Sequence, residues 1–198
     1  RIPLEVPFFK RIIQLDDINI TVAVERDTPG IEQATYAGTI PRTDEWSLSD
    51  LSNELKRMAS VEGEHGERWT LFHKIVTKFP PILARFVLRF PRLWPSLWIQ
   101  HRGGAVMISS PAKYGVDMLV GNWPWPIGFS FGLVKDRPVV VDGTVVTRPT
   151  MMLIMSFDRR LMAGAPAARF FNAVSQALIS IESSLEGKGE IAGSQHHK

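Results

Sequence analysis

The chain contains no cysteine among its 198 residues. This absence excludes disulfide bonds, thiolate nucleophiles and cysteine-based zinc sites, and we expect a reducing, cytoplasmic location. No uncharged apolar run reaches 18 residues, so no transmembrane helix is expected. The formal net charge is only +3 and no recognised motif is present, so nucleic-acid binding is not expected. No spacing of potential ligands predicts a metal site.

The composition is that of an ordinary globular protein, with 44% hydrophobic residues. We expect one domain over residues 1–185 and a flexible polar tail over 186–198. The sequence opens with Arg1, and residues 2–9 already have strand character, so we expect the natural N-terminus to lie further upstream. Prolines interrupt a helical pattern in the middle of the chain, which predicts a helical insertion at about residues 64–102.

The remaining pattern alternates between strands and helices. Ser47 begins a capping box before a helix with one apolar face. Asp142-Gly143 predicts a type I′ turn between two valine-rich strands. No element is predicted for the stretch 25–46, which is rich in proline and glycine. Strands are predicted at residues 18–24, 105–109, 127–134 and 139–146 (as a hairpin), a strand buried on both faces at 150–157, and a helix at 165–183.

One segment near the C-terminus carries a recognisable motif. Residues 156–171 read SFDRRLMAGAPAARFF. They resemble the catalytic signature of the 2-oxo acid dehydrogenase acyltransferases, which runs Ser-Phe/Tyr-Asp-His-Arg-x-x-Asp/Asn-Gly and continues into a helix. The hairpin over 135–149 and the strand over 17–24 are also similar to that family.

The resemblance implies an α/β fold of the chloramphenicol acetyltransferase type, a two-layer sandwich in which helices back a mixed sheet. It further implies a trimer with an active site at each subunit interface. In that family a histidine of one subunit deprotonates the acceptor, and a serine or threonine of its neighbour stabilises the oxyanion. Coenzyme A thioesters are substrates there, so no tightly bound cofactor is expected.

This sequence departs from the family at two motif positions. Arg159 stands where the family has its catalytic histidine, and Ala163 stands where it has an acid or amide. A guanidinium stays protonated and cannot act as a general base. The favoured interpretation of Arg159 is an ion pair with a nearby carboxylate; the alternatives are that it holds an oxyanion or a coenzyme phosphate, or lowers the pKa of an acceptor thiol. One hypothesis is therefore an impaired acyltransferase that binds an acyl ligand or a partner, as a homotrimer or together with an active homologue. The other is an active enzyme that uses a non-standard base on an acyl-coenzyme A or acyl-carrier donor.

Several further residues are candidates for the site. Ser109 and Ser110 are positioned to donate to an oxyanion, or else they end a strand and bond the local backbone. Asp158 matches a motif position that orients its neighbours through a salt bridge. Trp123 and Trp125, in Trp-Pro-Trp-Pro, either line an acyl channel or form a subunit contact. His101 is a weaker candidate for a displaced base.

A basic helical pattern precedes these residues. Arg85 and Arg89 recur at helical spacing opposite Ile82 and Phe86, close to Trp94. The favoured interpretation is a helix packed on the sheet with a solvated basic face. The alternatives are binding of the phosphates of coenzyme A, or contact with an anionic membrane surface, which is not favoured here. The same pattern includes His73, Lys74, Lys78, Phe72, Ile75, Arg92 and Trp98.

Overall fold

The computed structural model describes the chain except residues 7–8, 29–30, 61–77, 79, 122 and 194–198. It forms two compact units, Arg1–Leu161 and Met162–Lys198. The strands of the first unit are β1 (Ile2–Val6), β2 (Phe9–Ile13), β3 (Ile20–Thr28), β4 (Ile31–Ile40), β5 (Val106–Ser109), β6 (Ile127–Phe131), β7 (Lys135–Val141), β8 (Thr144–Thr150) and β9 (Leu153–Phe157). Its helices are η1 (Thr43–Glu45), α1 (Leu48–Ser60), α3 (Pro81–Arg89), η2 (Phe90–Arg92), α4 (Pro95–Arg102) and η3 (Ala112–Tyr114). The second unit contains α5 (Gly164–Gly193).

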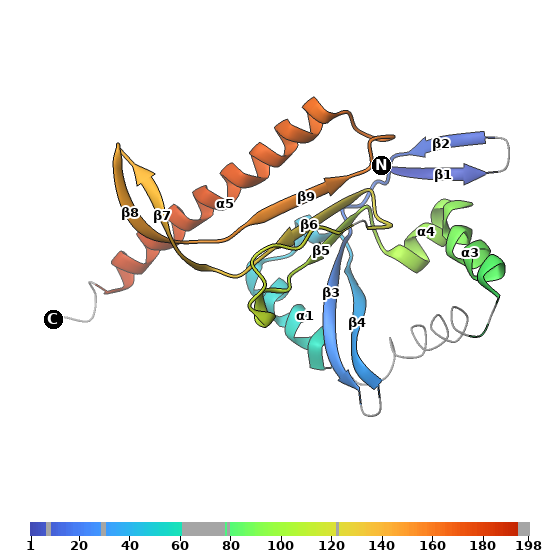
Figure 1. Cartoon of the computed structure of the whole chain (residues 1–198), viewed down its shortest axis with the longest axis horizontal. Helices are drawn as coiled ribbons and strands as arrows, with labels where there is room; N and C mark the ends of the chain where they lie inside the picture. Colours follow the sequence, from blue (N-terminus) through green and yellow to red (C-terminus); the bar gives the residue numbers. More distant parts are fainter. Residues whose placement is uncertain (7–8, 29–30, 61–77, 79, 122, 194–198) are drawn as a thin grey trace. The chain divides into compact units, whose positions relative to one another are not determined.

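A mixed five-stranded sheet forms the centre of the first unit (Figure 1). Its strand order is β4-β3-β5-β6-β9. β5 lies parallel to both β3 and β6, whereas β4 and β9 run antiparallel to their neighbours. The two outer strands thus reverse direction relative to the parallel centre. The predicted mixed sheet backed by helices is confirmed.

Helix α1 covers one face of this sheet, which we call the α1 face. Ser47 caps the helix: its Oγ accepts a bond from the Asp50 N–H at 3.1 Å and donates to the Asp50 carboxylate at 2.6 Å. Buried Met58 then packs with Val24 and Ile40 of the β3–β4 hairpin. Of the apolar face predicted for this helix, Leu51 and Met58 pack against the sheet, whereas Leu48 and Leu55 are exposed.

The opposite face carries the serines of the sheet, and we call it the serine face. Residues paired across neighbouring strands point to the same side of a sheet, and the side alternates along each strand. Met107, Gly128 and Ser156 form one row, and Ser109 pairs with Ser130 two positions along. These residues therefore share a face that α1 does not cover.

A close backbone contact fixes the turn from α4 into β5. Gly103 ends α4 with φ +72°, and a Cβ built there would lie 1.8 Å from the Thr39 Oγ1. Thr21 Oγ1 donates to the carbonyl of Arg102 at 2.8 Å. Asn19 Nδ2 donates to the Gly103 carbonyl at 3.2 Å. Only glycine combines this dihedral angle with this proximity.

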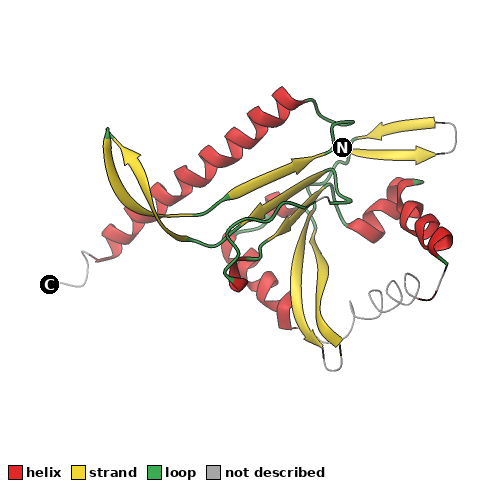
Figure 2. Cartoon of the chain, viewed as in Figure 1, coloured by secondary structure: helices red, strands yellow, loops and turns green. Residues whose placement is uncertain are grey.

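Two hairpins lie outside the central sheet (Figure 2). β1 and β2 form the first, and its Ile2 and Leu4 make a small core with the fully buried Trp98 of α4. β7 and β8 form the second, turning through Asp142 (φ 50°) and Gly143 (φ 78°) as the Asp-Gly signal predicts.

Some predicted elements differ from the structure. Residues 31–40 form a strand, because their alternating pattern pairs with β3 despite the flanking proline and glycine. The strand predicted at 150–157 begins at Leu153, and all five of its residues are half-buried. Among the described strands it pairs with β6 at the edge of the sheet, and its half-buried residues show that full burial on both faces was wrong. The final helix begins at Gly164, one residue before its predicted start, and extends to Gly193, beyond its predicted end at residue 183.

Candidate active site

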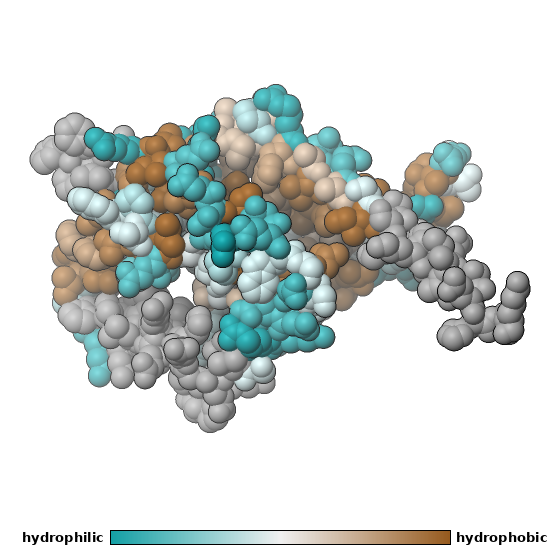
Figure 3. Space-filling view, turned by 180° about the vertical axis from the view of Figure 1, so that it is seen from behind, coloured by the Kyte–Doolittle hydropathy of each residue, from teal (hydrophilic) through white to brown (hydrophobic). Residues whose placement is uncertain are grey.

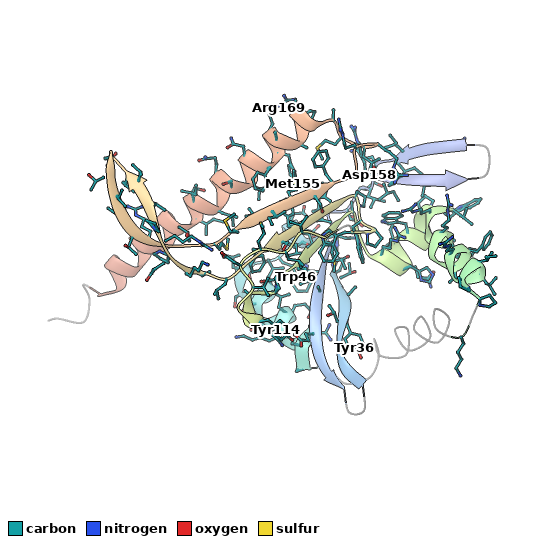
Figure 4. All side chains as sticks on the ribbon, viewed as in Figure 1. Tyr36, Trp46, Tyr114, Met155, Asp158 and Arg169 are labelled. Carbon is teal, nitrogen blue, oxygen red and sulfur yellow. The ribbon has the colours of Figure 1, made fainter. Side chains whose placement is uncertain are left out.

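The motif begins in β9 and continues into a tight turn organised by Asp158 (Figure 4). The Asp158 carboxylate accepts bonds from the Arg160 side chain, from Nε at 2.9 Å and from Nη2 at 2.5 Å. It also accepts the Arg160 backbone N–H at 2.9 Å. Hydrogen bonds from Arg160 hold the pKa of Asp158 below its ordinary value of 3.8, against an opposing effect of burial. Asp158 thus shapes the turn and stays ionised.

Arg159 lies between Asp158 and Arg160 in the sequence but takes no part in their ion pair. Its side chain is exposed, and within the part of the chain that the structure describes it has no carboxylate partner. The ion pair favoured for Arg159 from the sequence is therefore not observed there. Ala163 is exposed in the second unit and precedes α5, where its carbonyl accepts the Ala167 N–H at 3.1 Å. Its methyl side chain offers no polar group.

The two predicted serines differ in their surroundings. Ser110 Oγ donates to the Phe131 carbonyl at 2.9 Å and accepts the Ala112 N–H at 3.3 Å, so it closes the end of β5 locally. Ser109 is half-buried on the serine face, and its hydroxyl makes no hydrogen bond to any described residue. Of the pair, Ser109 is the one left available to a ligand.

A third serine was missed by the sequence analysis. Ser130 pairs with Ser109 across β5 and β6, is 3% exposed, and has an Oγ without a partner among the described residues. Buried hydroxyls are normally hydrogen-bonded, so this one is unusual. The only signal in the sequence was a single polar residue inside the apolar run of β6.

The two tryptophans are held by the chain itself. Trp125 Nε1 donates to the Arg102 carbonyl at 2.7 Å, beside the exposed His101 of α4. The Trp123 indole lies against Gly128, since a Cβ there would come within 2.3 Å of its ring. Trp123 therefore covers part of the serine face. Trp125 ties the loop before β6 to the end of α4 through its bond to Arg102.

The candidates lie at two opposite ends of the central strands. Phe157 pairs with Ile127, and the Asp158 N–H donates to the Pro126 carbonyl at 2.8 Å, so the motif turn lies where β6 begins. β5 is parallel to β6 and begins at the same end. Ser109 ends β5, about 10 Å away along the strand at roughly 3.3 Å per residue. Within one chain, Arg159 and His101 are thus separated from Ser109 along the strand direction.

Other site types find little support in the described residues. No group of three or more potential ligands that could hold a metal ion occurs among them. A surface hollow beside α1 is lined by Glu45, Trp46, Asp50, Asn53, Glu54 and Arg57, none of which is a predicted site residue. His65, His73, His196 and His197 lie outside the described residues.

Residues 100–186 match the model of the 2-oxoacid dehydrogenases acyltransferase catalytic domain. The succinyltransferase component of the mitochondrial 2-oxoglutarate dehydrogenase complex of Saccharomyces cerevisiae is 35% identical over 78 residues, or 38% of this chain. The chain spans only about 17% of the length of that relative. The chain is thus related to the 2-oxoacid dehydrogenase acyltransferases, as its motif indicates.

Solved structures show the same fold. A probable dihydrolipoamide acetyltransferase from Listeria monocytogenes superposes with a TM-score of 0.58 at 20% identity, over 90% of this chain and 62% of the other. The cubic core of the pyruvate dehydrogenase multienzyme complex gives 0.57 at 22% identity, over 92% and 62%. Dihydrolipoamide acetyltransferase of Azotobacter vinelandii, studied for the catalytic roles of a serine, a histidine and an asparagine, gives 0.52 at 23% identity, over 87% and 58%.

Proposed function

We propose that this chain is an acyltransferase-fold domain without base-catalysed turnover, which binds an acyl ligand or an assembly partner. The observation that carries the proposal is the chemistry of the turn after β9. Arg159 is exposed there, and a guanidinium group takes no proton from an acceptor thiol or hydroxyl. Ala163 has no group that would orient a base. A positioned base typically contributes on the order of 10²–10⁴ in rate, which this turn does not supply.

The Azotobacter vinelandii enzyme supports this assignment of positions. The histidine and the asparagine studied in its catalytic mechanism lie four positions apart. Arg159 and Ala163 are also four positions apart, and they follow the strand that carries the motif. We infer that they occupy the places of that pair in this chain.

The separation of Ser109 from Arg159 supports a site shared between subunits. The start of β6 and the end of β5 lie about 10 Å apart along the strand, farther than a general base and an oxyanion donor stand from one reacting carbonyl. A neighbouring copy, or an active homologue, brings the two ends together. The cubic core of the pyruvate dehydrogenase complex is an assembly of this fold. We therefore place the chain in a homotrimer or in a mixed trimer, with a coenzyme A or carrier thioester as the ligand.

A second candidate function is an active acyltransferase with a displaced base. The observation in its favour is Ser109, whose hydroxyl is half-buried and unbonded among the described residues, as an oxyanion donor requires. Its base would have to reach Ser109 from a neighbouring subunit, because His101 lies towards the other end of β5 in its own chain. This candidate predicts turnover by the unmodified protein.

The two candidates are separated by a turnover assay on the protein as it stands. Release of free coenzyme A from acetyl-coenzyme A is measured with dihydrolipoamide as the acceptor. We expect no turnover above the uncatalysed rate. A rate of about 10 per second, typical of enzymes, would contradict the proposal. If His101→Ala then abolished that rate, the displaced base would be identified.

Restoring the motif tests whether the remaining site is intact. The double variant Arg159→His with Ala163→Asp returns a base and the group that positions it. With the rest of the site preserved, turnover should rise roughly 10²-fold or more. Arg159→His alone is the matched control and should gain less, because its imidazole is not oriented. If the folded double variant shows no turnover and calorimetry detects no binding of coenzyme A to it, the chain is an assembly domain and the acyl-ligand role is wrong.

A further inference from the structure

A run of large apolar side chains is exposed along α3, η2 and the start of α4. Ile82 is 83% exposed, Phe86 is 66% exposed and Trp94 is 63% exposed. Phe90 continues the line at 45%. In Figure 3, hydrophobic residues form part of the surface on the side where α3 lies. The interpretation that this helix packs its apolar face on the sheet was therefore wrong for Ile82 and Phe86.

The apolar residues line up because of the helical repeat. Ile82, Phe86 and Phe90 are spaced by four residues, so they lie one above another on the same side of the helix. We call this line the α3 apolar row. The segment that follows is held in place from its other side: Trp98 of α4 is 1% exposed in the core with β1, and its Nε1 donates to the Gly104 carbonyl at 2.9 Å. The α3 apolar row is thus separate from the residues that anchor the segment.

Positive charge borders this row. Arg85 and Arg89 are exposed and form a second line, also spaced by four residues, directly beside it. The sequence contains no aspartate or glutamate from residue 68 to residue 116, while lysine and arginine recur through it. An apolar stripe flanked by one sign of charge is the pattern of a helix that lies in a membrane interface.

We propose that α3, with η2 and Trp94, is a peripheral docking surface for an anionic lipid bilayer. The α3 apolar row inserts at the boundary between the lipid headgroups and the acyl chains, and Arg85 and Arg89 extend their charged ends to the lipid phosphates. Trp94 is suited to the level of the headgroups, where tryptophan is enriched. None of the described helices is long and apolar enough to cross a bilayer, so this contact lies in the plane of the membrane. Charge complementarity selects anionic over neutral lipid.

Vesicle binding of the full chain tests the proposal. Cosedimentation is compared for vesicles of phosphatidylcholine alone and vesicles that also contain phosphatidylserine. We expect binding to the anionic vesicles, and loss of most of it between about 0.1 M and 1 M salt, where the screening length falls from about 10 Å to 3 Å. The variant Arg85→Gln with Arg89→Gln should bind the anionic vesicles more weakly by roughly tenfold or more. The variant Ile82→Gln with Phe86→Gln should lose a similar factor, because glutamine keeps the helix but removes the apolar area.

Matched controls separate this surface from general effects of charge and hydrophobicity. Lys56→Gln with Arg148→Gln changes the net charge equally at two exposed positions elsewhere, and Val140→Gln removes an apolar side chain that is 70% exposed on β7. Both controls should bind like the unmodified chain. Equal binding to neutral and anionic vesicles, or equal losses in controls and test variants, overturns the proposal. So does a change of assembly size in the Ile82→Gln, Phe86→Gln variant with vesicle binding unchanged, which would make this surface a subunit interface.

Discussion

At the scale of single residues, the turn after β9 is determined by one carboxylate. Asp158 gathers the side chain and backbone of Arg160, and the neighbouring Arg159 is exposed and has no acidic partner in the described part of the chain. A second carboxylate acts in the same way elsewhere. Asp117 pairs with Lys135 at 2.8 Å and with Arg137, so the loop after β5 is tied to β7. The hydrogen bond from Lys135 is the main cause that lowers the pKa of Asp117.

Replacing the first of these carboxylates tests its structural role. Asp158→Asn should lower the free energy of unfolding by about 0.5–1 kcal/mol at neutral pH, a modest value because half of the Arg160 side chain is exposed to solvent. The folded-state pKa of Asp158 lies below 3.8, so its contribution is present above that pH and is lost as the pH falls through the folded-state value. The difference in the free energy of unfolding between the unmodified chain and Asp158→Asn, measured by urea denaturation, should therefore disappear in acid. Asp142→Asn, in a turn without an ion pair among the described residues, is the control and should show no such closing gap.

At the scale of elements, the same residue type meets different demands in different turns. Gly103 and Gly143 have nearly equal dihedral angles, φ 72° and 78°. A Cβ at Gly143 would meet nothing within 4 Å, whereas one at Gly103 would meet the side chain of Thr39. A substitution at either glycine thus carries the same backbone strain, but only a substitution at Gly103 also carries a steric cost.

This pair of glycines gives a matched measurement of that steric cost. Gly143→Ala should destabilise by about 1–2 kcal/mol, the cost of a left-handed residue with a Cβ. Gly103→Ala should cost a further 1–3 kcal/mol or so, because Thr39 and the α4–β5 turn must move apart. Chemical denaturation of both variants gives the difference. Equal losses would show that the turn yields freely and that the contact with β4 is not a constraint.

At the scale of the whole molecule, the separation of the candidate residues is the main finding. The serine face places Ser109 at one end of β5, and the motif turn lies at the other end of the neighbouring strand. The proposed function requires that a single chain holds two parts of a site rather than a complete one. Such a division favours an oligomer in which each interface joins the unlike ends of two chains.

The assembly itself is open to direct measurement. We expect light scattering at micromolar concentration to give three times the chain mass, either alone or after mixing with an active homologue. Substitutions confined to the α3 apolar row should leave this mass unchanged. A stable monomer under both conditions would contradict a site shared between subunits, and with it the proposed role in assembly.

The sequence by itself determined the local features and the family. The Asp-Gly turn, the capping box at Ser47 and the motif of residues 156–171 act through neighbours in the chain, so their patterns are visible without a fold. β4 could not be predicted, because its pairing with β3 overrides the proline and glycine that flank it. The same holds for Ser130, because both its pairing with Ser109 and the burial of its side chain arise only in the folded sheet.

Only the tertiary structure decided which candidates can act together. Ser109 and Ser110 are equivalent in sequence, but the end of β5 leaves the Ser110 hydroxyl bonded to Phe131 and that of Ser109 unbonded among the described residues. The amphipathic pattern of α3 is equally compatible with a buried and an exposed apolar side. In the folded chain Ile82 and Phe86 are exposed while Trp98 of α4 is buried in a core with β1, and local periodicity encodes neither outcome.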